Sequence, residues 1–176
     1  MAKPHKTFYL SFLDKYALFS YKKDMDIKEL KLHLAPRKAL LGFDYGEKRL
    51  GVAVSDLLLM TATPLKIIQR ASFDKDIAEI RRLIEDKEVG ALIYGLPLQM
   101  NGFEGETAAA VRKFADKIFA ETNLPFAFWD ERLSSRAVET FLIKQADASR
   151  AKRKQVLDAS AAAYILQGAL DALRYL

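Results

Sequence analysis

Four acidic residues stand out because they lie at the ends of apolar segments or inside one. Asp44 ends an apolar segment, Asp130 and Glu131 follow a later one, and Asp158 is the only charged residue of the segment 156–169. A buried charge is costly unless it is paired or binds a metal ion. Carboxylates from these segments could converge on two cations about 3.5–4 Å apart, which would activate water and stabilise the leaving oxygen of a phosphodiester.

Each of these acids also has a purely structural interpretation. Asp44 could form the turn that follows its strand, and Asp158 could be an acid near a helix start that the helix dipole stabilises. Asp130 and Glu131 are adjacent, and adjacent strand residues point to opposite faces of a sheet. Only one of the pair is therefore expected to face a shared site, and the other could form a strand-end salt bridge with Arg132.

Other common catalytic chemistries lack the residues that they need. The chain contains no cysteine, which excludes disulfides and thiolate metal sites, and its only histidines are His5 and His33. A histidine-rich zinc site or a Ser-His-Asp triad is therefore not expected. A metal held mainly by carboxylates would be Mg²⁺ or Mn²⁺.

Several cations lie close in sequence to the acids, in a chain whose formal net charge is +5. They favour binding to the phosphates of a nucleic acid, although a solvated helix face would look the same. The turn 46–49 brings glycine and two cations together, and four more cations precede Asp158. The candidate nucleic-acid-binding residues are Lys48, Arg49, Arg132, Arg150, Lys152, Arg153 and Lys154.

The elements that must position these residues follow from hydrophobic periodicity and turn signals. Strands are expected at 39–45, 50–54, 65–68, 91–94 and 125–129. Helices are expected at 73–87 with Ser72 as N-cap, from the end of the loop 96–105 to about 121, from Ser134 or Ser135 to 145, and at 152–173. This order predicts an α/β fold, a mixed five-stranded sheet with helices on both faces.

Residues 1–37 differ from the expected domain at 38–176. They are rich in aromatic residues with interleaved lysines, and Pro36 marks a boundary. They could form a helix that packs on the domain, an RNA-contacting arm, or an incorrectly assigned start, with Met25 as an internal alternative. No apolar run reaches the length of a membrane span or of a signal peptide, so we expect a cytoplasmic protein without membrane contact.

Four segments in this order resemble the YqgF/RuvX family of Holliday-junction-resolvase-like proteins, also described as pre-16S rRNA nucleases. The segments are 41–56, 95–102, 130–135 and 156–161, and together they span most of residues 38–173. The resemblance implies a ribonuclease-H-like fold, a divalent metal and endonuclease action at the 5′ end of small-subunit ribosomal RNA.

The resemblance also implies roles for individual residues. Asp44 would be the first-strand acid, Asp158 the last-helix acid, and Asp130 or Glu131 the third. The chain departs from the family pattern at Asn101, where relatives often carry aspartate, and residues 1–37 have no recognised counterpart in the family.

Three alternative functions use the same residues differently. A true Holliday junction resolvase would act on branched DNA rather than structured RNA, and four-way junctions suit a symmetric dimer. A non-catalytic nucleic-acid-binding adaptor would not need the retained acids. An actin-like ATPase would need two such domains, which 176 residues do not provide. The sequence leaves the choice between monomer and homodimer open.

Overall fold

The computed structural model describes residues 24–133 and 150–176, except for the side chains of 24, 133 and 150–159. The helix expected between 134 and 145 lies outside the described residues, as do residues 1–23. In chain order the elements are β1 (Asp24–Met25), α2 (Ile27–His33), β2 (Ala39–Tyr45), β3 (Arg49–Ser55), β4 (Ala62–Gln69), α3 (Phe73–Asp86), β5 (Val89–Leu96), α4 (Glu106–Thr122), β6 (Phe126–Asp130), the short 3₁₀ helix η1 (Glu131–Leu133) and α6 (Arg150–Arg174).

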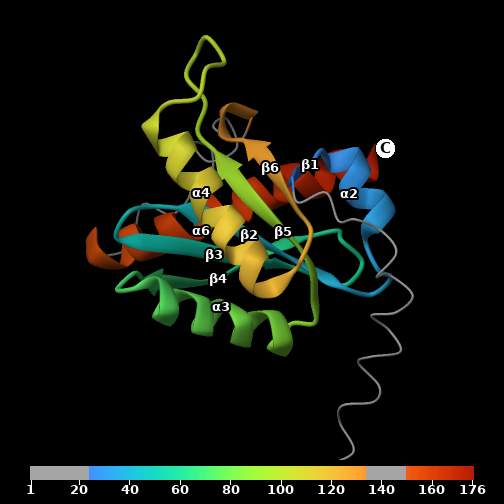
Figure 1. The fold of residues 1–176 in the computed structure, drawn as a ribbon, viewed down its shortest axis with the longest axis horizontal. Coiled ribbons are helices and arrows are strands. Elements are labelled where there is room, and N and C mark those ends of the chain that lie inside the picture. The colour runs from blue at the N-terminus through green and yellow to red at the C-terminus, as the bar shows by residue number, and fades with distance from the viewer. Residues whose placement is uncertain (1–23, 134–149) are drawn as a thin grey trace, which may run out of the picture.

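The strands form one mixed sheet in the order β1-β6-β5-β2-β3-β4. The consecutive strands β2, β3 and β4 pair antiparallel, whereas β5 runs parallel to β2 and β6 parallel to β5. All five expected strands are present, and β1 adds a two-residue sixth strand beside β6. The expected mixed α/β sheet is therefore confirmed, with six strands rather than five (Figure 1).

The alternation of side chains along β2 divides the core between the two faces of the sheet. Leu41 and Phe43 belong to one buried cluster, which they share with residues of α3 and α4. Leu40 belongs to a second cluster, which contains the apolar residues of α6. Because side chains alternate along a strand, Gly42 and Asp44 share the face of Leu40. The first strand thus presents its acid to the side of the sheet that α6 covers.

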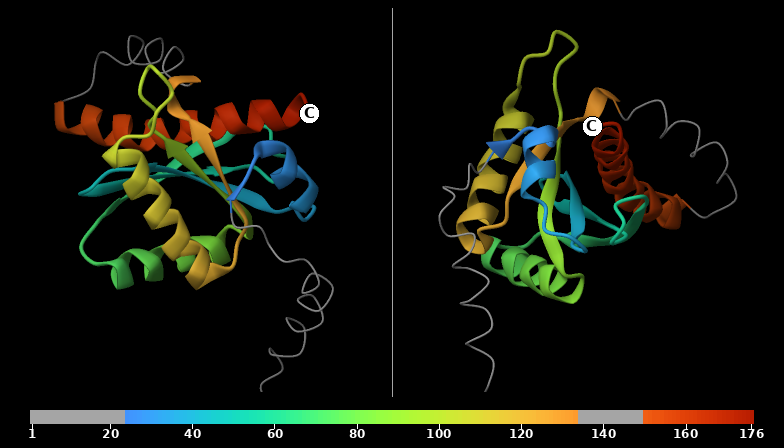
Figure 2. Two further views of the ribbon diagram at one scale, coloured as in Figure 1. Left: turned by 45° about the horizontal axis from the view of Figure 1, so that its top comes forward. Right: turned by 90° about the vertical axis from the view of Figure 1, so that its right-hand side faces the viewer.

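The helices lie on both faces, as the sequence predicts. Figure 2 shows α3 and α4 on one side of the sheet and α6 on the other. The helix α3 begins as expected at Ser72, whose hydroxyl accepts a hydrogen bond from the backbone N–H of Lys75 at 3.4 Å. The helix α4 ends at Asn123, which adopts the left-handed conformation with φ of 54° and closes the helix.

Residues 24–33, which lie in the expected extension, pack against the rest of the fold. Leu30 of α2 is fully buried in the cluster beneath α6, and Lys31 donates a hydrogen bond to the carbonyl of Leu173 at 2.9 Å. Asp26 and Glu29 form a capping box that fixes the start of α2. Within the described parts of the chain, no helix is long and apolar enough to cross a membrane.

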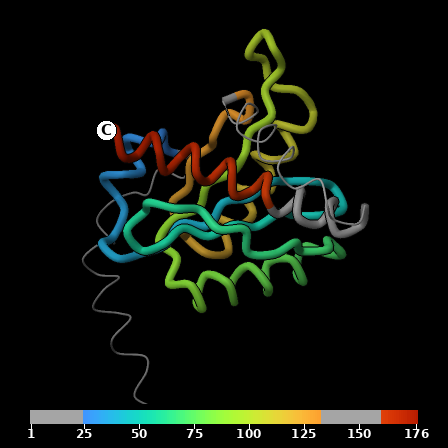
Figure 3. Tube along the Cα trace, turned by 180° about the vertical axis from the view of Figure 1, so that it is seen from behind, coloured from blue at the N-terminus to red at the C-terminus, as the bar shows by residue number. Residues whose placement is uncertain are grey.

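The direction of α6 decides which of its residues approach the end of β2. A Cβ atom built on Gly42 would lie 2.6 Å from the Cβ of Leu166 and 3.1 Å from the carbonyl oxygen of Ala162. Further along the helix, Gln167 accepts a hydrogen bond from the N–H of Ala62 at 2.9 Å, at the end of the sheet where β2 starts. The helix therefore runs from the carboxyl end of β2 back toward its start (Figure 3).

Candidate active site

Asp44 is the acid that the sheet positions most directly. It is the sixth residue of β2, half-buried, opposite Gly51 in the antiparallel ladder with β3. The β2–β3 turn begins one residue after Tyr45, so Asp44 lies at the strand end, where α/β sheets place their sites. By alternation it lies on the α6 face of the sheet.

Glu131 reaches the same face from the neighbouring part of the sheet. It begins η1, immediately after the last residue of β6, and it lies next to Gly95 of β5. A Cβ atom on Gly95 would lie 2.5 Å from Oε1 of Glu131 and 2.5 Å from Cδ1 of Ile165 in α6. The absence of a side chain at position 95 therefore lets the Glu131 carboxylate lie between β5 and α6.

Burial and neighbouring charges perturb the pKa of Glu131. Burial, together with the negative charges of Asp44 and Asp130, raises this pKa from its ordinary 4.5 to about 7. Two nearby carboxylates with half-buried oxygen atoms suit a hard divalent cation such as Mg²⁺ or Mn²⁺, which would neutralise their repulsion. These residues therefore fit the metal that the sequence implies.

Asp130 forms a different set of contacts from its neighbour. Its carboxylate accepts hydrogen bonds from the Nη2 of Arg132 at 2.6 Å and from the Nε and backbone N–H of Arg132, both at 3.0 Å. These bonds to Arg132 hold the pKa of Asp130 below its ordinary value. The strand-end salt bridge considered for one member of this pair is thus formed by Asp130, while the Glu131 carboxylate lies beside Gly95 and Ile165.

The third expected acid belongs to α6, but the Asp158 side chain lies outside the described part of the chain. Residue 158 precedes Ala162 by one helical turn, a spacing that puts both residues on one face of the helix. From Ala162 to residue 158 the helix advances about 6 Å, and from Gly42 to Asp44 the strand advances about 6–7 Å in the same direction. Among the described side chains, no set of three metal-ligating residues gathers.

The expected phosphate-binding cations divide into two groups. Lys48 is exposed in the β2–β3 turn and Arg49 is half-buried at the start of β3, both within a few residues of Asp44. Arg132 is exposed beside Glu131, although its guanidinium binds Asp130. The side chains of Arg150, Lys152, Arg153 and Lys154 lie outside the described residues.

An ion pair that the sequence analysis missed supports the turn between β2 and β3. Arg70 follows β4 and donates from Nη1 to the carbonyl of Gly46 at 3.0 Å and from Nε to Asp76 at 3.1 Å. Asp76 is 97% buried in the first turn of α3, and the Arg70 guanidinium lies 4.4 Å from the ring centroid of Tyr45. The sequence did contain a signal for this ion pair: Asp76 lies four residues after the N-cap Ser72 and six residues after Arg70.

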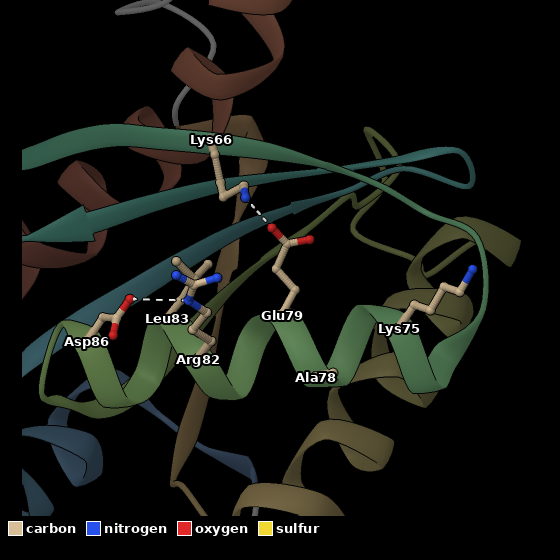
Figure 4. A pocket seen from close by; sticks show the side chains of 7 residues that line it. All are labelled: Lys66, Lys75, Ala78, Glu79, Arg82, Leu83 and Asp86. Atoms are coloured by element: carbon tan, nitrogen blue, oxygen red, sulfur yellow. Dashed lines mark hydrogen bonds and ion pairs between the residues drawn. The ribbon is translucent and has the colours of Figure 1, made fainter.

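A surface hollow lies away from the carboxylates, between β4 and α3 (Figure 4). Lys66 and Glu79 form an ion pair across it, and its remaining walls come from α3. Because α3 covers the face of the sheet opposite α6, this hollow lies on the other side of the sheet from the face that Asp44 and Glu131 share.

Most of the chain is similar in sequence to proteins of one family. The family model described as "RuvX: Holliday junction resolvase" matches residues 38–172. A relative from Methylocella silvestris named "Putative pre-16S rRNA nuclease" is 47% identical over 150 residues, which are 85% of this chain and 92% of that protein. A relative of the same name from Rhodospirillum rubrum is 47% identical over 140 residues, which are 80% and 87% of the two chains.

Solved structures with similar folds are more distant in sequence. The structure described as T. thermophilus RuvC in complex with Holliday junction substrate has a TM-score of 0.49 at 15% identity, covering 77% of this chain and 94% of that one. Fowlpox virus resolvase with its substrate Holliday junction DNA has a TM-score of 0.49 at 13% identity, with 77% and 98% covered. On the family match and the identity to its relatives, the chain belongs to the RuvX family.

Proposed function

We propose that this protein is a divalent-metal-dependent endonuclease that cleaves structured RNA during maturation of the 5′ end of 16S ribosomal RNA in the cytoplasm. The observation that carries the proposal is the juxtaposition of Asp44 with the half-buried Glu131 on the α6 face, in the space that Gly95 leaves. The name shared by its relatives supports the ribosomal RNA precursor as substrate.

In this proposal Asp44, Glu131 and Asp158 hold the metal, with Mg²⁺ or Mn²⁺ as the ions that suit carboxylate ligands. The bound ion would supply an activated water for attack on phosphorus and stabilise the oxygen that leaves. Glu131 must lose its proton to act as a ligand, and its pKa of about 7 makes this step sensitive to pH near neutrality.

Asp130 has a positioning role in the proposed site. Its carboxylate binds the guanidinium of Arg132, the residue that follows Glu131. A partly exposed arginine there could bind a substrate phosphate in addition to Asp130. Lys48 and Arg49 approach the site from the β2–β3 turn and would bind a phosphate on its other side.

The test is cleavage of a precursor of 16S ribosomal RNA and of a four-way junction DNA, each incubated with Mg²⁺, with Mn²⁺ or with EDTA. The proposal predicts metal-dependent cleavage of the RNA and little cleavage of the junction. An Asp44→Asn preparation purified in parallel controls for contaminating nucleases. Preferential cleavage of the junction would instead make the protein a resolvase, and binding without cleavage of either substrate would make it an adaptor.

A further inference from the structure

The loop between β5 and α4 carries two apolar side chains into solvent, and it contacts Arg132, the residue that follows Glu131. In Figure 1 this loop, coloured yellow-green, rises from the carboxyl end of β5 and projects beyond the rest of the fold. Met100 is 94% exposed and Phe103 is 70% exposed at its tip. Apolar surface held in water is unfavourable, so a projecting pair of such side chains indicates a contact surface.

The backbone of the loop is tied together, so the two side chains are presented in a defined arrangement. Gln99 donates its N–H to the carbonyl of Phe103 at 2.9 Å, and Gly102 donates to the carbonyl of Gln99 at 2.8 Å. Gly102 has a φ of 84°, a conformation that favours glycine. The side-chain oxygen of Asn101 accepts from the N–H of Phe103 at 3.1 Å, a bond that an aspartate at this position would also make.

Two sets of hydrogen bonds tie the loop, one to the residue that follows Glu131 and the other to α4. Arg132, which follows Glu131, donates from Nη1 to the carbonyl of Gln99 at 3.2 Å. On the other side of the loop, Glu104 accepts two hydrogen bonds from Arg112 at 2.8 and 2.6 Å. A substrate whose phosphodiester lies between Asp44 and Glu131 therefore passes close to this loop.

The chemistry of the tip favours a nucleobase as its occupant over a protein surface. A stable protein interface uses about 20–30 residues on each side, whereas this narrow tip offers two apolar side chains. A single base covers an area of that size, and it stacks on an aromatic ring regardless of its identity. The thioether of methionine also makes favourable contacts with aromatic rings. Bases inside a duplex are already stacked on both faces, so the base must be unpaired.

We propose that Met100 and Phe103 bind an unpaired nucleobase of the substrate next to the phosphodiester that is cleaved. The proposal rests on the proposed nuclease function and specifies its substrate: a strand with an unstacked base at the cleavage site. The β5–α4 loop then selects loops, ends or branch points over continuous duplex.

The test compares Phe103→Ala and Met100→Ala with the unchanged protein in EDTA, so that binding is measured without cleavage. The ligands are an RNA with an unpaired segment and a continuous duplex of the same sequence, each carrying a fluorescent purine analogue whose emission is quenched by stacking. Phe103→Ala should weaken binding of the unpaired RNA by roughly 5- to 150-fold and abolish the quenching, because base–aromatic stacking is lost. Binding of the duplex should change little, and Phe103→Trp should restore both signals.

Tyr175→Ala is the matched control, because Tyr175 is an aromatic residue that is 86% exposed near the C-terminus, at the far end of α6. Its removal should leave both signals unchanged. Unchanged affinity and quenching in a Met100→Ala/Phe103→Ala double variant would overturn the proposal, whether or not the protein cleaves RNA. A protein that loses quenching on Phe103→Ala yet cleaves no substrate would uphold the loop contact and reject the nuclease function.

Discussion

At the scale of single residues, the chemistry of the site depends on how closely Glu131 is held to Asp44. Glu131 is partly removed from water by β5 and α6, and its charge is opposed by the charges of Asp44 and Asp130. Both effects make its ionised form unfavourable. The folded protein therefore carries a carboxylate whose charge is destabilising, and in the proposed site a bound cation would offset that charge.

Replacing this carboxylate should stabilise the metal-free protein. Because Glu131 has a pKa of about 7 in the folded state and about 4.5 when unfolded, the folded state binds the proton more tightly. The unfolding free energy is then highest below about pH 4.5 and falls as the pH rises to about 7. Glu131→Gln should remove this fall and raise the unfolding free energy at pH 8 by on the order of 2 kcal/mol.

Urea unfolding in EDTA at pH 5 and at pH 8 measures the effect. A Glu131→Gln variant that is no more stable than the unchanged protein at pH 8 would show that the Glu131 carboxylate is not destabilised in the fold. Asp86→Asn is a suitable control, because Asp86 is an exposed acid at the end of α3.

Gly95 should be required for cation binding rather than for folding alone. In Gly95→Ala the new Cβ would lie 2.5 Å from the Glu131 carboxylate and must displace it. We expect the affinity for Mn²⁺, measured by isothermal titration calorimetry, to fall by about 10- to 100-fold, the range seen when a ligand loses its correct orientation.

Gly90→Ala controls for the general cost of a side chain in β5. Gly90 lies at the other end of the same strand, where a Cβ would approach the Lys38 side chain at 2.6 Å. Both variants should lose stability, but only Gly95→Ala should lose Mn²⁺ affinity. Equal Mn²⁺ affinity of the two variants would contradict the placement of the metal at Glu131.

The sequence predicted that Asp130 and Glu131 have different contacts, but not which of them lies on the α6 face. The alternation of a strand predicts that only one of two adjacent acids faces a site, and Asp130 and Glu131 do diverge. The chain, however, leaves the strand at Asp130 and turns into η1, so alternation alone could not select the residue. The selection depends on the space that Gly95 leaves for Glu131, which is a tertiary contact, and on the local ion pair of Asp130 with Arg132.

At the scale of elements, the β2–β3 hairpin depends on α3 as well as on its own turn. The ion pair of Arg70 with Asp76 connects the end of β4 to the first turn of α3, and Arg70 also binds the carbonyl of Gly46. The backbone N–H of Arg70 donates to the carbonyl of Lys48 at 3.0 Å. These bonds fix the turn that follows Asp44 and presents Lys48 and Arg49.

Loss of this ion pair should reduce both stability and catalysis. Asp76→Asn leaves the Arg70 guanidinium without its buried counter-charge, which should lower the unfolding free energy by about 2–4 kcal/mol. At a temperature where the variant remains folded, KM for RNA should rise more than kcat falls, because the turn positions phosphate-binding cations. Denaturant unfolding and steady-state cleavage measure the two effects.

Glu79→Gln supplies the comparison, since the ion pair of Glu79 with Lys66 also joins α3 to β4 but is partly exposed and distant from the site. Its loss should cost at most about 1 kcal/mol and leave KM unchanged. A similar rise in KM in both variants would mean that the Arg70–Asp76 pair acts on stability alone.

The elements themselves were largely predictable from local patterns. The apolar segments predicted β2, β3, β5 and β6, and the helical spacing of Ile77, Ile80 and Ile84 predicted α3. The edge strand β1 was not predictable, because a two-residue strand has no alternation to detect. Its pairing depends on α2, which buries Leu30 beneath α6 and holds Met25 beside β6.

At the scale of the whole molecule, α6 packs along the sheet with its N-terminal part toward the end of the sheet that carries the candidate site. Gly42 and Gly95 allow this approach, because side chains there would collide with Leu166 and Ile165. The N-terminal turns of α6 contain the basic segment 150–154, and the helix runs from the carboxyl end of β2. This segment is therefore expected near the path of a substrate that reaches Asp44.

The basic segment should contribute to affinity without reading sequence. Replacing Lys152, Arg153 and Lys154 with alanine should weaken RNA binding for all sequences and flatten the log–log dependence of affinity on salt by about two to three units. The maximal rate should fall less than on loss of a carboxylate, because the reacting groups are unchanged. Fluorescence anisotropy at several salt concentrations measures the slope. An unchanged slope would show that these three cations do not contact the phosphates of the RNA.

In the proposed site Asp44, with Glu131 and Asp158, holds the cation required for RNA cleavage, and the variant Asp44→Asn tests this role. The measurement is the single-turnover rate of precursor 16S RNA cleavage in Mg²⁺, with the fold checked by thermal unfolding. The rate should fall by at least about 100-fold, because loss of a ligand exceeds the effect of misorienting one. The melting temperature should stay equal or rise, since one charge leaves a repulsive pair. Cleavage by Asp44→Asn at the rate of the unchanged protein would show that Asp44 does not hold a catalytic metal ion.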